Sequence, residues 1–97
     1  MPARKSKHYP AVTGPNADTD PVVPANERRV ALFIQNTGAN PGLVRFAGAT
    51  QGNGSDMAFP AGFVQRWDQA DTTPLESISV SSAAATTWCI IETVAAS

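Results

Sequence analysis

The segment RRVALFIQNTGANPGLVRF, residues 28–46, decides the expected fold. Two runs rich in β-branched and aromatic residues flank NTGANPG, whose asparagine, glycine and proline residues suit the positive-φ and fixed-φ positions of a turn. Alternation of apolar side chains along each run is typical of a strand that buries one face. The segment therefore predicts a β-hairpin. The residues expected on its core face are Val30, Leu32, Ile34, Val44 and Phe46.

The chain beyond residue 46 continues as short apolar runs separated by turn clusters. The runs are MAF, FVQRW, SISVSS and TWCIIETVA, and Trp67 and Trp88 alternate in phase with apolar neighbours, which places both in the expected core. No segment combines a helical period with a length of about 10 residues. We therefore predict an all-β domain over residues 27–97, a small antiparallel β-sandwich or barrel of about six to eight strands.

Residues 1–26 show a different pattern. Prolines stand at positions 2, 10, 15, 21 and 24, and each removes a backbone donor and biases the residue before it toward extended geometry. No hydrophobic period runs through the segment, which predicts an extended N-terminal arm beside the domain. Cationic residues gather near its tip and acidic residues near its base. The residues of the tip that we expect to contact a partner are Arg4, Lys5, Lys7 and Tyr9.

The composition restricts the class of function. With 97 residues the chain fits one domain with a thin core. Its net charge of −1 and isoelectric point of about 5.6 give no general attraction to nucleic acid or to an anionic membrane. No apolar run approaches the roughly 20 residues of a membrane span, and the N-terminus lacks the apolar middle region of a signal peptide. We therefore expect synthesis in a cytoplasm, with neither nucleic acid nor a membrane as partner.

The sequence carries no catalytic or metal-binding signature. It has one cysteine, Cys89, and one histidine, His8, so neither a Cys-based nor a His-His metal site can form. Cys89 lies between Trp88 and Ile90 in an expected strand, where a thiol behaves as a small buried apolar group. His8 lies in the expected arm, where a hydrolytic triad would have to be built from a mobile tail. We expect no enzyme activity, no cofactor and no metal site.

Three arginines within the expected strands, Arg29, Arg45 and Arg66, are further candidates for partner contact. Two interpretations remain open. In the first, the arginines form a solvated row or pair with Asp68 and Glu76. In the second, the sheet face that carries them packs against another protein, because arginine with aromatic neighbours is enriched at the centres of interfaces.

The order of segments from residue 28 to residue 95 resembles the small β-sandwich modules of tailed-bacteriophage virions. In those modules an arginine-led strand ends in an Asn-Thr/Leu-Gly turn, as in RRVALFIQNTG, and the next strand has a V-R-F-like ending, as in GLVRF. An apolar-Pro-Gly corner precedes an aromatic-containing strand, as in MAFPAGFVQRW. A serine-rich I-x-V strand and a closing strand ending near glutamate complete the pattern, as in SISVSS and IETVA. Residues 1–26 have no counterpart in the typical module.

Such modules serve as capsid decoration or cement proteins, as head fibres, and as tail or baseplate components. The resemblance implies a structural virion protein on the capsid exterior that binds the major capsid protein lattice and stabilises the head. It also implies a homo-oligomer, with a trimer favoured. Independently of the resemblance, an extended arm can add its backbone to an exposed strand edge of a neighbour, so we expect residues 1–26 to contribute to assembly. The alternative is a head-fibre, tail or baseplate module for host-surface attachment, with the polar loop AGATQGNGSDM as its recognition surface.

Overall fold

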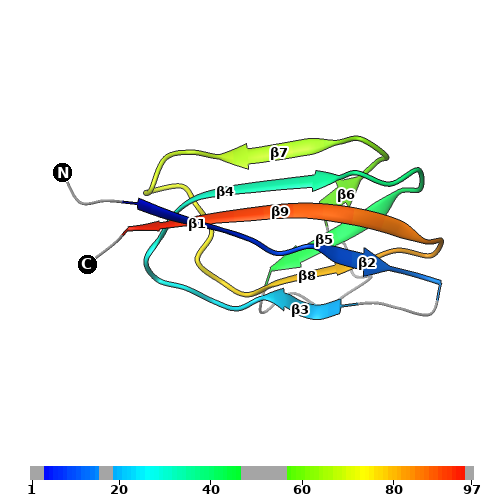
Figure 1. The fold of residues 1–97 in the computed structure, drawn as a ribbon, viewed down its shortest axis with the longest axis horizontal. Coiled ribbons are helices and arrows are strands. Elements are labelled where there is room, and N and C mark those ends of the chain that lie inside the picture. Colours follow the sequence, from blue (N-terminus) through cyan, green and yellow to red (C-terminus); the bar gives the residue numbers. More distant parts are fainter. Residues whose placement is uncertain (1–3, 16–18, 47–56, 96–97) are drawn as a thin grey trace.

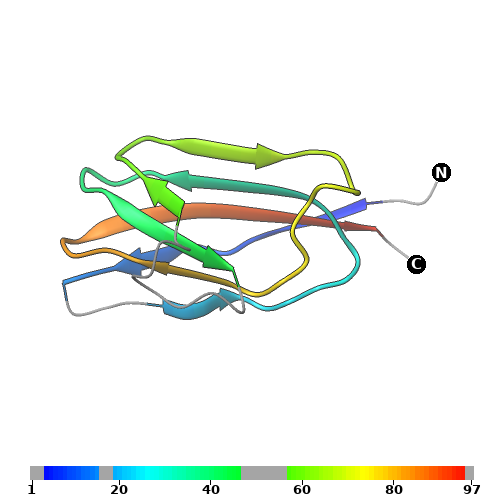
Figure 2. The same cartoon turned by 180° about the vertical axis from the view of Figure 1, so that it is seen from behind.

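The structure, a computed structural model, describes residues 4–15, 19–46 and 57–95. The nine strands of these residues form two antiparallel sheets that pack face to face (Figure 1 and Figure 2). Sheet A has the order β1-β9-β4-β7, with β2 also paired to β9, and sheet B has the order β3-β8-β5-β6. The strands of sheet A are β1 (Arg4–His8), β2 (Ala11–Thr13), β4 (Arg29–Asn36), β7 (Val64–Trp67) and β9 (Thr86–Ala95). Those of sheet B are β3 (Thr19–Val23), β5 (Gly42–Phe46), β6 (Met57–Phe59) and β8 (Ile78–Ser81).

The predicted all-β antiparallel sandwich is confirmed. The core lies between the sheets and is filled by alternate residues of both, as strand geometry requires. Trp88 is buried as expected, whereas Trp67 packs half-buried at the margin of the core and meets Phe46 edge to face, with ring centroids 5.8 Å apart. No helix of the described residues is long and apolar enough to cross a membrane. The core residues are Val23, Leu32, Ile34, Val44, Phe59, Ile78, Val80, Trp88 and Ile90.

The segment predicted as a hairpin is instead a crossover between the sheets. β4 pairs with β9 and β7 in sheet A, whereas β5 pairs with β8 and β6 in sheet B. The buried side chain of Asn36 fixes this corner, because its amide nitrogen donates to the carbonyls of Asn40 (2.8 Å) and Phe59 (2.9 Å). Its amide oxygen accepts from the hydroxyl of Thr86 (2.7 Å) and from the backbone N–H of Gly38 (3.1 Å). These bonds tie the corner to both sheets.

A register irregularity changes which residues of β4 face the core. The pairing of β4 with β9 shifts between Arg29 and Ala31, so Val30 falls at a β-bulge. Arg29 is consequently buried, and Val30, which we predicted in the core, is only half-buried. From Leu32 onward the predicted alternation holds.

The N-terminal segment is part of the sandwich. β1 and β2 pair with β9 along one edge of sheet A, and β3 pairs with β8 at the edge of sheet B. Figure 1 shows β1 and β2 lying along β9 and β3 below β8, rather than projecting from the domain. The expectation of an arm beside a domain of residues 27–97 is therefore corrected for the described part of residues 1–26. Extended geometry was predictable from the prolines, but pairing depends on backbone groups that side-chain patterns do not reveal.

Candidate interaction surface

Arg29 is the centre of a buried hydrogen-bond network rather than a surface residue. Its Nε donates to Oε2 of Glu92 at 2.8 Å, with both side chains almost wholly buried. One terminal nitrogen donates to the carbonyls of Pro74 (2.6 Å) and Glu76 (3.0 Å), and the other donates to the carbonyl of Pro24 (2.9 Å). Every nitrogen of the guanidinium thus has a partner inside the chain. Arg29 holds β4, β9 and two loops together and is not available to a binding partner.

The three arginines expected on one sheet face lie in three different environments. Arg29 points between the sheets, Arg45 lies on the outer face of sheet B opposite Ser79, and Arg66 lies on the outer face of sheet A. The β-bulge turns Arg29 inward, and the crossover places β5 in the other sheet. The interpretation that the three arginines share one binding surface is therefore wrong, and each arginine has to be considered separately.

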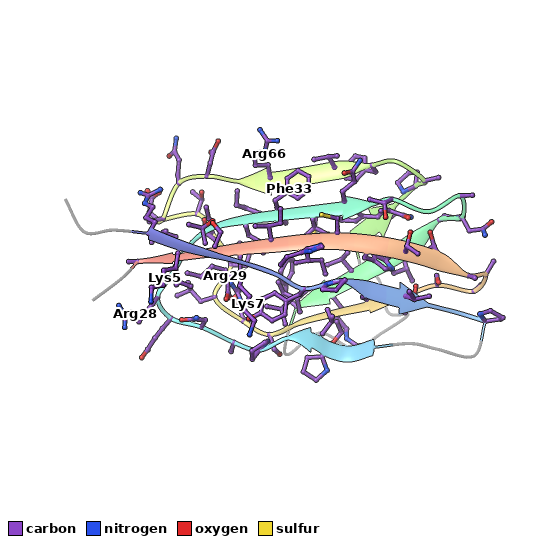
Figure 3. All side chains as sticks on the ribbon, in the orientation of Figure 1. Lys5, Lys7, Arg28, Arg29, Phe33 and Arg66 are labelled. Atoms are coloured by element: carbon purple, nitrogen blue, oxygen red, sulfur yellow. The ribbon has the colours of Figure 1, made fainter. Side chains whose placement is uncertain are left out.

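The outer face of sheet A carries a row of side chains that crosses four strands. His8 of β1 is opposite Ile91 of β9, Ile91 is opposite Phe33 of β4, and Phe33 is opposite Arg66 of β7. Ile91 and Phe33 are half-buried, while His8 and Arg66 at the two ends are exposed. The guanidinium of Arg66 lies 5.5 Å from the centroid of the Phe33 ring, in cation–π range (Figure 3). An apolar centre between cationic or polar ends is a composition that suits protein contact.

The residues flanking this row extend the same surface. Cys89 lies opposite Gln35, and Gln35 lies opposite Val64, which is 40% exposed. Cys89 is a half-buried free thiol on this outer face rather than a core residue. We call this set the outer face of sheet A. Its residues are Ser6, His8, Ala31, Phe33, Gln35, Val64, Arg66, Cys89, Ile91 and Thr93.

The cationic residues predicted at the N-terminal tip lie on β1, the edge strand of sheet A. All five side chains of β1 are exposed, and Figure 3 shows Lys5, Lys7 and Arg28 at the same margin of the sandwich. Lys5 and Lys7 alternate with Arg4, so the three cations do not share one face of the strand. β1 therefore presents positive charge on both sides of the edge.

Tyr9 follows β1 and links this edge to the buried ion pair. Its hydroxyl donates a long hydrogen bond of 3.4 Å to Oε1 of Glu92, and the Lys7 ammonium lies 5.0 Å from its ring centroid. Partial burial and, secondarily, the negative charge of Glu92 raise the pKa of the Tyr9 phenol above its ordinary value. Tyr9 thus closes the Glu92 end of the network, and Lys7 covers it from the solvent side.

The outer face of sheet B carries an apolar hollow of about 500 Å³. Leu43 of β5 and Ala58 of β6 lie opposite each other in its lining, which also includes Pro41 and Pro60. The lining residues that the structure describes are mostly apolar and include no titratable group. The hollow is therefore suited to an apolar side chain.

Other features singled out in the sequence can be placed in part. No cluster of three or more histidine, cysteine or acidic side chains in the described ranges could hold a metal ion. His8 and Cys89 both lie on the outer face of sheet A, on β1 and β9. The proposed recognition loop, residues 47–57, lies outside the described residues except for Met57.

The partner of Arg29 was missed in the sequence. Glu92 occupies the same strand phase as Trp88 and Ile90, which the alternation places toward the core. A carboxylate in that phase is a recognisable signal, because a buried charge requires a counter-charge or hydrogen bonds. Its partner could not be named, since the bulge that turns Arg29 inward is not written in the alternation.

Comparison with known proteins supports the fold and goes no further. The sequence matches no protein-family model and no curated protein. Among solved structures, the chain is similar to a protein of Bacillus endospore appendages, described as a novel family of disulfide-linked pili. The two share 13% sequence identity with a TM-score of 0.57, over 98% of this chain and 88% of the other. At this identity the likeness establishes a common arrangement of strands.

Proposed function

We propose that the chain is a structural subunit that assembles on a larger protein particle and has no catalytic role. The observation that carries this proposal is the outer face of sheet A, where half-buried Phe33 and Ile91 form an apolar centre flanked by Arg66. Such a face lowers the cost of desolvation when another protein covers it. The fold it shares with an appendage protein is compatible with a structural role.

The finer proposal is that the particle is the head of a tailed bacteriophage and the chain is a capsid decoration protein. It rests on the segment order of residues 28–95, which resembles virion sandwich modules. In this role the outer face of sheet A binds the major capsid protein on the capsid exterior, and many copies on a symmetric lattice multiply a weak contact. Arg4, which shares the strand face of Ser6 and His8, supplies positive charge at the rim of the contact.

Co-sedimentation with empty capsids tests this proposal. Phe33→Glu replaces the aromatic centre of the outer face of sheet A by a carboxylate opposite Arg66, and we expect it to weaken capsid binding by at least about tenfold, since the apolar contact is lost and both charges have to be desolvated. Leu43→Glu is the matched control, because Leu43 is equally half-buried on a central strand of the opposite sheet. Equal capsid binding by both variants and by the unaltered chain would remove the outer face of sheet A from the proposal.

A second candidate is a head-fibre, tail or baseplate module that attaches to the host surface. The likeness to an endospore appendage protein favours it, because those appendages are described as pili. Adsorption of the purified chain to host cells separates the two. Binding to cells without binding to capsids would support the attachment module and overturn the decoration protein.

A further inference from the structure

The outermost strands of the two sheets differ in how they are protected against pairing. An edge strand presents unpaired N–H and C=O groups, and proteins shield such edges with lysine, proline or very short strands. β1 has the sequence RKSKH with every side chain exposed, β3 contains Pro21, and β6 has three residues and is followed by Pro60. β2 is also three residues long. Each of these strands therefore carries a feature that discourages a further strand.

β7 is the outermost strand without such a feature. It contains neither lysine nor proline, and among the described residues it pairs with β4 alone. Phe63, just before it, and Val64, its first residue, are each 40% exposed. Its single charge, on Arg66, lies over the Phe33 ring of β4 and so is held across the sheet face rather than along the free edge. Within the described part of the chain, β7 thus combines an open backbone edge with exposed apolar side chains.

We infer that β7 is the edge through which two copies of this chain pair, antiparallel and related by a two-fold axis. Hydrogen-bond alternation identifies the groups that face this edge. The N–H of Asn36 donates to the carbonyl of Phe63 at 3.1 Å, so Phe63, Gln65 and Trp67 direct their backbone groups toward β4. Val64 and Arg66 consequently direct theirs outward, where two copies can exchange about four backbone hydrogen bonds.

One register satisfies the side chains as well as the backbone. Directly opposed residues of two paired strands point to the same face of the sheet. In every allowed symmetric register, the Val64 and Arg66 side chains of both copies therefore lie on one face of the joined sheet. Centring the pair on Gln65 places Val64 opposite Arg66 of the second copy, and Phe63 opposite Trp67 of the second copy. It covers both exposed apolar residues and forms a cross-strand aromatic pair, which stabilises antiparallel sheets.

The neighbouring symmetric registers are less favourable. A shift centred on Arg66 sets the two guanidinium groups directly opposite each other, which is destabilising. A shift centred on Val64 leaves Trp67 beyond the paired strand, opposite the corner at residues 60–62, where Gly62 has a φ of 80°. The register centred on Gln65 is therefore the one that we assign to the dimer.

The resulting dimer joins the two copies of sheet A into one continuous sheet of doubled width. Because the contact is a short strand pair, it buries little area, and we expect a reversible dimer with a dissociation constant of about 10 μM to 1 mM. The inference rests on the proposed structural role for its biological purpose. It replaces the trimer expected from the sequence, since an isologous strand pair closes with two copies.

Analytical ultracentrifugation of the full chain tests the pairing. Val64→Lys places an ammonium opposite Arg66 of the second copy at two symmetric positions, and we expect the dissociation constant to rise by about tenfold or more. Val12→Lys is the matched control, because Val12 is 57% exposed on the opposite edge of sheet A, and we expect it to dimerise like the unaltered chain. A monomer at the highest concentrations, a trimer, or equal effects of the two substitutions would overturn the inference.

Disulfide trapping tests the register and does not depend on the behaviour of Val64→Lys. In a Cys89→Ser background, Gln65→Cys sets two thiols opposite each other at a non-hydrogen-bonded pair, within the Cα separation that a disulfide spans. Mild oxidation is expected to yield a covalent dimer, whereas Ser6→Cys on β1 in the same background is expected to yield no covalent dimer. Equal cross-linking at both positions, or none at Gln65→Cys, contradicts the assignment.

The two proposals fail independently. If the Val64→Lys variant is monomeric but still binds capsids, the decoration role stands and β7 serves self-association alone. If the chain dimerises through β7 but does not bind capsids, the dimer stands and the decoration role is refuted.

Discussion

Breaking the Arg29–Glu92 pair is expected to destabilise the sandwich more than any surface change. Arg29→Met keeps the length and the apolar stem of the side chain but removes all of its donors. It leaves the Glu92 carboxylate, 4% exposed, with only the 3.4 Å hydrogen bond from Tyr9 among those that the structure records. It also removes the guanidinium from the carbonyls of Pro24, Pro74 and Glu76.

The magnitude follows from these lost partners. Leaving one charge of a buried pair uncompensated costs about 3–5 kcal/mol. The three carbonyls that lose their donor are only part-buried, so water can reach them and together they add on the order of 1 kcal/mol. We therefore expect Arg29→Met to lower the free energy of unfolding by about 4–6 kcal/mol, against a total of about 5–15 kcal/mol for a domain. Glu92→Gln keeps an acceptor near Arg29, so its cost is about 3 kcal/mol.

Urea denaturation followed by tryptophan fluorescence measures these losses, with Trp88 in the core as the reporter. The double variant Arg29→Met with Glu92→Leu supplies the coupling, because it removes both charges together. We expect the double variant to be more stable than the sum of the single effects predicts, by about 1–3 kcal/mol. Single losses below about 1 kcal/mol would refute the assignment of Arg29 as a structural residue.

Three other predictions concern single residues. Tyr9 is the sole tyrosine and its pKa is raised in the folded chain, so tyrosinate absorbance should appear at higher pH in the folded chain than in urea. The same shift lowers the free energy of unfolding from about pH 10 upward, because the unfolded chain loses the phenol proton first. Tyr9→Phe should abolish this pH dependence. Gly42→Ala should lower the free energy of unfolding by about 1–3 kcal/mol and alter the near-ultraviolet circular dichroism of tryptophan, because the added Cβ meets the Trp88 ring. Gly62→Ala is the control, because Gly62 lies in open space at a φ of 80°. It should lower the free energy of unfolding by about 1 kcal/mol without that spectral change. Asn36→Ala should lower the free energy of unfolding by about 3 kcal/mol in urea denaturation, since it leaves buried corner groups without partners; a loss below about 1 kcal/mol would contradict this role.

The core could be predicted from the sequence because alternation is a local property. Leu32, Ile34 and Val44 lie where the period of two places them, and Ile78 and Val80 follow the same rule. Strand pairing is not local. The segment NTGANPG has turn chemistry that suits a hairpin and a crossover equally well, and the bonds that decide between them reach from Asn36 to distant parts of the chain.

The sequence predicted which types of residue the candidate surface contains, but it did not predict which of them are exposed together. Arg66 and the cations of β1 are exposed, as is usual for charged residues, whereas Arg29 is also an arginine and is buried. The difference comes from one irregular step in the ladder between β4 and β9. Alternation counted from Arg29 fails at that step, so a one-residue bulge converts a predicted contact residue into the centre of the internal network.

The position of the N-terminal segment changes how an arm-deletion experiment must be interpreted. Removing residues 1–26 would take β1 and β2 from β9 and β3 from β8. It would also remove Tyr9 from Glu92 and the Pro24 carbonyl from Arg29. The deletion would thus expose two strand edges and weaken the buried pair, so loss of capsid binding would follow from unfolding as readily as from a lost contact. Point substitutions on the outer face of sheet A and on β7 leave these bonds in place, which makes them the informative tests of how the chain assembles.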